Sequence, residues 1–130
     1  MHLLVVEDHP DSAHLFSRLL SLEGHAVDVA LDAHSALELC QRNSYDILLA
    51  DIGLPDGSGW ELMKTVLKHC PVRGIAISGY AYDADVEKSL EAGFSAHLTK
   101  PIAAESLFAT IARVAALPRP ASPNPIGAEN

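Results

Sequence analysis

The sequence predicts an α/β fold: a single doubly wound domain in which a five-stranded parallel sheet carries five helices on its two faces. Two features of the sequence indicate this class. Short apolar segments alternate five times with segments in which apolar residues recur three or four positions apart. Three of the short segments are almost continuously apolar, as is typical of strands buried on both faces. Strands that alternate with helices pair in parallel through right-handed crossovers, so the alternation predicts a parallel sheet.

Five segments have the length and composition of strands. The first, third and fourth are almost wholly apolar, and the second alternates apolar and polar residues. The five are HLLVV (2–6), AVDVA (26–30), DILLA (46–50), RGIAIS (73–78) and SAHLT (95–99). Each is far shorter than the roughly 20 apolar residues that cross a membrane as a helix, so we expect no membrane contact.

Five further segments have the 3.6-residue periodicity of amphipathic helices. We expect Gly24 to end the first of them and the side chain of Asp32 to cap the second. Pro71 marks the end of the third, because proline cannot continue a helix. The five segments are 10–23, 33–40, 60–69, 83–92 and 103–116.

The composition indicates one globular domain. The chain has 130 residues, of which 48% are hydrophobic, and a chain of this length buries a substantial core. We expect the domain to cover residues 1–117 and a disordered, proline-rich tail or linker to cover residues 118–130. The net charge of −8 argues against a nucleic-acid partner, which would require a basic surface. Two cysteines are too few for a disulfide framework, so we expect reduced thiols and a cytoplasmic location.

Charged and polar side chains stand at the ends of four predicted strands. Glu7 and Asp8 follow the first strand, and Asp51 follows the third. Ser78 ends the fourth strand, and Lys100 follows the fifth. Ligands of open parallel α/β sheets bind beyond the carboxyl ends of the strands, so these side chains should meet at one edge. Three crowded carboxylates repel one another, and Mg²⁺, which takes oxygen ligands, removes that conflict.

Asp51 is the candidate nucleophile at this edge. A carboxylate can attack phosphorus and form an acyl phosphate, while a bound metal ion offsets charge on the transferred oxygens. Lys100 and Ser78 can hold the remaining phosphoryl oxygens, the first as a point charge and the second as a hydrogen-bond donor. The residue types at this edge therefore predict phosphoryl transfer to Asp51.

Four segments of the sequence resemble the signature segments of receiver domains of two-component response regulators. They are VVEDHPD, DILLADIGLPDGSGWEL, IAISGYA and HLTKPI, and the resemblance covers residues 2 to about 116. It implies a flavodoxin-like sheet with strand order 2-1-3-4-5. It also implies a phosphorelay in which a sensor histidine kinase or a histidine phosphotransfer protein is the donor. Self-phosphorylation and slow self-hydrolysis would be the only chemistry, so we expect a signalling phosphoprotein and not a turnover enzyme.

The resemblance implies a role for each acidic residue. Asp51 matches the phosphoacceptor and one of the metal ligands. Glu7 and Asp8 match the acidic pair that binds Mg²⁺, with Mn²⁺ as an alternative, Asp8 directly and Glu7 through water. Gly53 matches the residue whose main-chain carbonyl completes the metal shell. The other six histidines show no ligand spacing, so we expect none of them at a metal site: His2, His9, His14, His25, His34 and His69.

The resemblance also implies a conformational switch. Ser78 matches the switch hydroxyl, and Lys100 matches the lysine that precedes a cis-proline. His97 stands where the family usually has a tyrosine or phenylalanine that follows the hydroxyl inward. Because a histidine changes charge near neutral pH, the response should be weaker than usual or depend on pH. The surface expected to change and to bind a downstream protein consists of the predicted helix 83–92, strand 95–99 and helix 103–116.

Three other functions stay open in the sequence. A flavodoxin-like nucleotide (FMN) binder would need a Ser/Thr/Gly-rich loop after the first strand, where this chain has EDHPD. An aspartyl-phosphate phosphatase typically carries a second acid two residues after the nucleophile, where this chain has Gly53. A pseudo-receiver would keep the fold and bind a partner without phosphotransfer, and His97 leaves that alternative open.

The larger context of the domain has two alternatives. It is either a free-standing regulator or the receiver of a hybrid histidine kinase. The DIGLP form of the loop after Asp51 and the proline-rich tail look slightly more like receivers of hybrid kinases. In either case we expect output through a protein partner or through another part of a longer chain.

Overall fold

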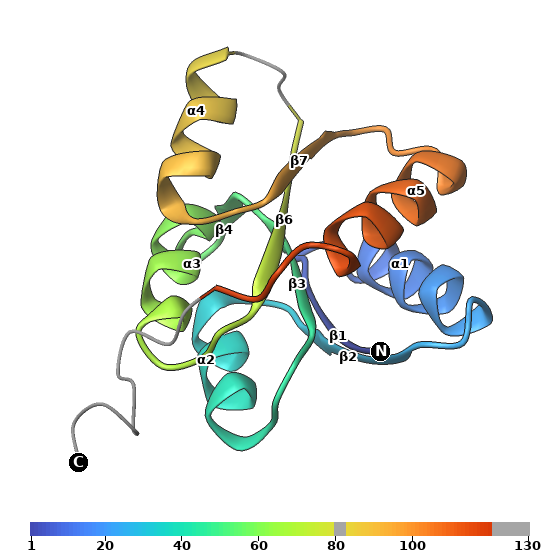
Figure 1. The fold of residues 1–130 in the computed structure, drawn as a ribbon, viewed down its shortest axis with the longest axis horizontal. Coiled ribbons are helices and arrows are strands. Elements are labelled where there is room, and N and C mark those ends of the chain that lie inside the picture. The colour runs from blue at the N-terminus through green and yellow to red at the C-terminus, as the bar shows by residue number, and fades with distance from the viewer. Residues whose placement is uncertain (80–82, 121–130) are drawn as a thin grey trace.

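Five parallel strands form one sheet in the order β2-β1-β3-β6-β7 (Figure 1). The computed structural model describes residues 1–79 and 83–120. The strands of the sheet are β1 (His2–Val6), β2 (Ala26–Ala30), β3 (Ile47–Asp51), β6 (Arg73–Ser78) and β7 (Ala96–Thr99). Counted within the sheet, this is the predicted order 2-1-3-4-5, so the fold class and the strand order are confirmed. β3 lies one residue later than predicted, and Asp51 is its last residue.

Five helices cover the two faces of the sheet. Figure 1 shows α1 and α5 on one face, and α2, α3 and α4 on the other. Their bounds are α1 (Pro10–Leu22), α2 (Ala33–Arg42), α3 (Gly59–Leu67), α4 (Asp83–Ala92) and α5 (Ala104–Ala115). The predicted cap of α2 is confirmed, because the side chain of Asp32 accepts the Ser35 amide at 2.7 Å. Among the described residues, no helix is long and apolar enough to span a membrane.

The three inner strands of the sheet, β1, β3 and β6, are apolar because both of their faces are buried. In β1, Leu3 and Val5 pack with α1 and α5, whereas Leu4 and Val6 pack with the helices of the other face. β3 repeats this alternation, and all five of its residues are buried. A side chain of this size contributes about 1.5–3 kcal/mol on full burial, so β1 and β3 anchor the helices of both layers. Their carboxyl ends are thereby held rigidly at one edge of the sheet.

The glycine-rich loop after β3 is an ordered hairpin, which the sequence did not predict. Its strands β4 (Gly53–Leu54) and β5 (Gly57–Ser58) pair antiparallel. Between them, the carboxylate of Asp56 accepts the amides of Ala33 at 2.8 Å and His34 at 3.0 Å, at the start of α2. These two hydrogen bonds lower the pKa of Asp56 below its ordinary value. The loop beside Asp51 is therefore fixed to a helix on one face of the sheet.

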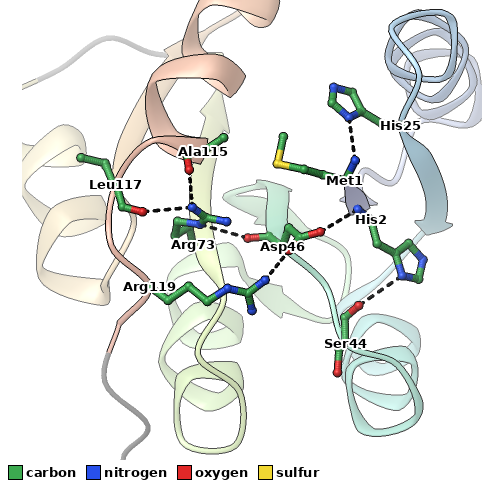
Figure 2. A network of polar contacts seen from close by, with 9 residues as sticks. All are labelled: Met1, His2, His25, Ser44, Asp46, Arg73, Ala115, Leu117 and Arg119. Carbon is green, nitrogen blue, oxygen red and sulfur yellow. Dashed lines mark hydrogen bonds and ion pairs between the residues drawn. The ribbon is translucent and has the colours of Figure 1, made fainter.

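A polar network closes the opposite, amino-terminal edge of the sheet (Figure 2). The buried Arg73 donates through Nη1 to the carbonyls of Ala115 at 2.6 Å and Leu117 at 3.0 Å. Asp46 forms an ion pair with Arg119. These contacts fix the end of α5, and the segment that follows it, beneath the sheet. Residues 118–120 form no helix or strand, residues 121–130 lie outside the described part, and the predicted division after residue 117 stays a prediction.

Candidate functional site

The structure places the predicted site residues at the carboxyl-terminal edge of the sheet. Glu7 follows β1, Asp51 ends β3, Ser78 ends β6 and Lys100 follows β7. Parallel pairing sets these strand ends side by side, since Val6 lies opposite Ala50 and Ser78 opposite Thr99. The Lys100–Pro101 peptide bond is cis, as the resemblance implied.

Lys100 bridges two carboxylates at this edge. Its Nζ lies 2.7 Å from Oε1 of Glu7 and 2.8 Å from Oδ2 of Asp51. The Glu7 side chain is fully buried, and the Asp51 side chain is 11% exposed. Buried carboxylates are costly unless they are paired, so the ammonium group offsets part of that cost. One ammonium cannot neutralise two carboxylates, and the site keeps an excess of negative charge.

The pKa values follow from this arrangement. Burial raises the pKa of Glu7 above its ordinary value, and the neighbouring charge of Asp51 adds to that effect, while the contact with Lys100 opposes it. Burial alone would lower the pKa of Lys100, but hydrogen bonds to Asp51 and Glu7 outweigh it and raise that pKa. Lys100 therefore stays an ammonium group, whereas Glu7 is the carboxylate whose charged form is destabilised by burial.

A main-chain amide and a lysine side chain hold the Asp51 carboxylate from two sides. Its Oδ1 accepts the amide of Gly53 at 2.8 Å, and its Oδ2 accepts from Nζ of Lys100. A Cβ added at Gly59 would lie 2.5 Å from the main-chain oxygen of Asp51 and 2.8 Å from Cα of Ile52. Only glycine fits there, which allows the start of α3 to pack against the acceptor. The carboxylate is thus held in one orientation at the edge.

The acidic residues provide donors that suit a divalent cation. Ligand atoms of Glu7, Asp8 and His9 lie within 4.8 Å of one another. Oε2 of Glu7 accepts the amide of His9 at 3.2 Å, and the ammonium group of Lys100 lies 2.7 Å from Oε1. Hard carboxylate oxygens crowded at one edge fit Mg²⁺. Asp51 does not belong to this group in the structure, and Gly53 contacts Asp51 through its amide.

The sequence analysis expected none of the other six histidines at a metal site, and that expectation stays a prediction. The structure places the imidazole of His9 in the group formed with Glu7 and Asp8. The reason is local, because the chain turns at His9 to begin α1 with Pro10 as its first residue. Proline at the start of a helix is the signal that could have placed this turn.

Ser78 contacts the predicted switch histidine directly. Its Oγ lies 2.7 Å from Nε2 of His97, and Nδ1 of that ring lies 3.1 Å from Oγ of Ser89 in α4. The indole of Trp60 in α3 donates to the same Ser89 oxygen at 2.9 Å. Ser89 in turn donates to the main-chain oxygen of Asp85 at 3.0 Å. Sequence reasoning assigned neither Ser89 nor Trp60 to this site, since contacts between helices leave no spacing signal.

Comparison with known proteins shows the family of this chain. The family model for the response regulator receiver domain matches residues 3–112. An uncharacterized 14.6 kDa protein of Leptolyngbya boryana is 37% identical over 105 residues, which are 78% of this chain and 80% of that protein. The polar-differentiation response regulator DivK of Brucella anthropi is 32% identical over 114 residues, 84% of this chain and 91% of DivK. Longer relatives match only in part: this chain spans 50% of the transcriptional regulatory protein DltR of Streptococcus agalactiae and 12% of the sensor histidine kinase RcsC of Salmonella typhi.

Solved structures share the fold. A CheY-like receiver domain protein of Methanospirillum hungatei JF-1 has a TM-score of 0.83 at 30% identity, over 88% of this chain and 92% of that chain. A response regulator of Burkholderia pseudomallei, solved with a phosphorylated aspartic acid, a calcium ion and citrate, has a TM-score of 0.78 at 28% identity, over 83% of this chain and 64% of that chain. With the strand order, the acidic edge and the match over residues 3–112, this chain belongs to the response regulator receiver domain family.

Proposed function

We propose that this domain is the phosphoacceptor of a two-component phosphorelay. It takes a phosphoryl group from a phosphohistidine onto Asp51 and then changes a surface that binds another protein. The observation that carries the proposal is the pairing of one ammonium group, Lys100, with two buried carboxylates, at 2.7 Å from Glu7 and 2.8 Å from Asp51. The relative from Burkholderia pseudomallei, solved with a phosphorylated aspartic acid, supports it.

The transfer is a displacement at phosphorus. An oxygen of the Asp51 carboxylate forms the new P–O bond while the P–N bond of the donor phosphohistidine breaks, and the electron pair of that bond stays on the imidazole nitrogen. Lys100 already contacts Oδ2, so its Nζ can donate to a phosphoryl oxygen with little movement. The amide of Gly53 holds Oδ1 in place and so limits the directions from which the carboxylate can attack.

Mg²⁺ fits the donor set of this edge. We propose that Glu7, Asp8 and Asp51, together with the carbonyl of Gly53, hold it, with Mn²⁺ as an alternative. When bound, the cation supplies positive charge that offsets the charge on the transferred oxygens. Lys100 is then released from part of its role toward Glu7 and can contact the phosphoryl group.

The donor should be a protein that carries the phosphohistidine, either a sensor histidine kinase or a phosphotransfer protein. A mostly apolar hollow of about 500 Å³ opens directly beside Lys100. Its apolar walls come from α1 and from the loop after β7, and Leu15 in α1 is 53% exposed. Exposed apolar side chains next to the acceptor support a protein surface as the source of the phosphoryl group. A downstream protein would bind the surface of α4, β7 and α5.

The chemistry of the domain is limited to its own phosphorylation and hydrolysis, so it acts as a switch and not as a turnover enzyme. A cytoplasmic location belongs to this proposal, and the two free cysteines, Cys40 and Cys70, agree with it. Membership in a longer hybrid histidine kinase is compatible with the same chemistry, and the sensor histidine kinase RcsC is one of the longer relatives.

Beryllium fluoride with magnesium chloride tests the proposal, since it mimics a phosphoryl group on an aspartate. We expect the amide signals of Asp51, Ser78 and Lys100 to move in the unmodified protein and to stay in place in Asp51→Asn. Equal shifts in Asp51→Asn would reject Asp51 as the acceptor. A lack of shifts in both proteins would favour the pseudo-receiver alternative.

A further inference from the structure

The geometry points to a hydrogen-bonded line, from Ser78 through His97 and Ser89 to Trp60, that carries the state of the acceptor edge to helices α3 and α4. This inference rests on the proposed function, and His97 and Ser89 are positioning residues in it. The line consists of the 2.7 Å, 3.1 Å and 2.9 Å contacts that join the four side chains. It crosses from β6 to β7, then to α4 and α3.

The protons in this line have one consistent arrangement when the imidazole is neutral. The Ser89 hydroxyl donates its only proton to the main-chain oxygen of Asp85, and an indole N–H such as that of Trp60 can only donate. The Ser89 oxygen must therefore accept from Nδ1–H of His97. The other ring nitrogen, Nε2, then has no proton and accepts from the hydroxyl of Ser78. The whole line is directed from Ser78 toward α4.

The Ser89 oxygen is saturated by these contacts. Its side chain is fully buried, with one proton donated and two hydrogen bonds accepted, from His97 and Trp60. A buried polar group that loses a partner finds no water to replace it. A rotation of the His97 ring therefore disturbs Ser89, and Ser89 passes the change to the indole of Trp60.

Phosphorylation would act on the other end of the line. The Ser78 hydroxyl has one proton, so it cannot donate at the same time to a phosphoryl oxygen and to Nε2 of His97. Engagement of a phosphoryl group must break the 2.7 Å contact or force the ring to change its tautomer or position. A tyrosine or phenylalanine at this position would offer no ring nitrogen to accept from Ser78. The coupling is thus a property of the histidine in this chain.

The line ends at the molecular surface between α3 and α4. Trp60 lines a hollow of about 310 Å³ there, and Nζ of Lys88 lies 5.1 Å from the centre of its ring. Glu61, Lys64 and Glu91 complete the lining. A change at Ser78 therefore alters the α3–α4 surface, in addition to the α4–β7–α5 surface of the proposed function.

The indole N–H signal of Trp60, the one tryptophan of the chain, gives a direct test. In the ¹⁵N-labelled full chain, addition of beryllium fluoride and magnesium chloride should move this signal. Its shift should depend on the reagent concentration in the same way as the shift of the Ser78 amide. In Ser89→Ala the indole response should be lost, while the amides of Asp51 and Lys100 still move. Ser21→Ala, which removes an exposed hydroxyl in α1, should behave like the unmodified protein.

Each contrary result has a distinct meaning. Movement of the Asp51 and Lys100 amides without movement of the Trp60 indole would overturn this inference and leave the proposed function standing. An indole response that is unchanged in Ser89→Ala would do the same. No movement anywhere would overturn both. If Ser89→Ala fails to fold, the ¹⁵N signals of the His97 ring in the unmodified protein decide: the line requires the Nδ1–H tautomer in the free state, and the Nε2–H tautomer contradicts it.

Discussion

The two edges of the sheet both hold buried charges, but they balance them differently. At the amino-terminal edge, Arg73 is surrounded by main-chain carbonyls, and Asp46 is paired with Arg119 (Figure 2). At the carboxyl-terminal edge, Lys100 is the one cationic side chain, within the described part of the chain, that is paired with Glu7 and with Asp51. The first edge is satisfied by the protein itself, whereas the second retains negative charge.

This difference separates a structural network from a chemical one. Groups whose hydrogen bonds and charges are all met by the protein contribute to stability and have no reason to react. An excess of carboxylate charge is costly in the folded state, and a bound cation and a transferred phosphoryl group change that balance. The comparison therefore predicts that substitutions at the amino-terminal edge reduce stability, while substitutions at the acceptor edge change binding and chemistry.

The largest effect on stability is expected for Arg73→Ala. The substitution leaves the carbonyls of Ala115 and Leu117 without their charged donor, so the free energy of unfolding should fall by about 2–3 kcal/mol. Urea unfolding measures this change, and Arg42→Ala, at an exposed site in α2, is the matched control. Phosphorylation of the folded variant should persist. If Arg73→Ala lost phosphorylation and kept its stability, the amino-terminal edge would have a chemical role and not the structural role assigned to it.

A smaller effect of opposite sign is expected for Glu7→Gln. Because burial raises the pKa of Glu7, the folded state favours its proton, and the stability this gives is present below the ordinary pKa of 4.5 and lost as the pH rises through the folded value. At pH 7 the neutral variant should therefore be more stable than the unmodified protein, and it should bind Mg²⁺ more weakly. Unfolding at several pH values and a magnesium titration measure both. A variant that is less stable at pH 7 would show that burial does not destabilise the charged form of Glu7.

The smallest effect is expected for Asp56→Asn. The Asp56 carboxylate lies near the acceptor edge, but its hydrogen bonds are met by main-chain amides. Hydrogen bonds from the amides of Ala33 and His34 lower the pKa of Asp56, so its contribution to stability is present above the ordinary pKa of 3.8 and lost as the pH falls through the folded value. The variant should melt slightly below the unmodified protein at pH 7, and the gap should close in acid. Glu91→Gln, at an exposed site in α4, should show no such gap. A gap that persists in acid would assign the effect to something other than the charge.

The sequence predicted the sheet and helices because their patterns are set by burial. β1 and β3 are apolar throughout since both faces are covered, and the helices keep their periodicity for the same reason. The hairpin of β4 and β5 was missed because strands of two residues carry no pattern. The convergence of Glu7, Asp51 and Lys100 followed from the topology alone.

The spacing of residues in the sequence did not predict contacts that arise when helices and strands pack together. Ser89 meets His97 and Trp60 because α3, α4 and β7 come together in three dimensions. The sequence therefore did not predict the hydrogen bonds of the His97 ring, although it predicted the position of His97 in a switch.

Intact-mass spectrometry after incubation with acetyl phosphate and magnesium chloride tests the central claim most directly, namely that the charge imbalance at the acceptor edge makes Asp51 a phosphoacceptor. We expect one labile adduct of about 80 daltons in the unmodified protein, as one phosphate requires, and none in Asp51→Asn or after removal of the metal by a chelator. Arg73→Ala should still form the adduct. An adduct that persists in Asp51→Asn, or its absence from the unmodified protein, would contradict the account.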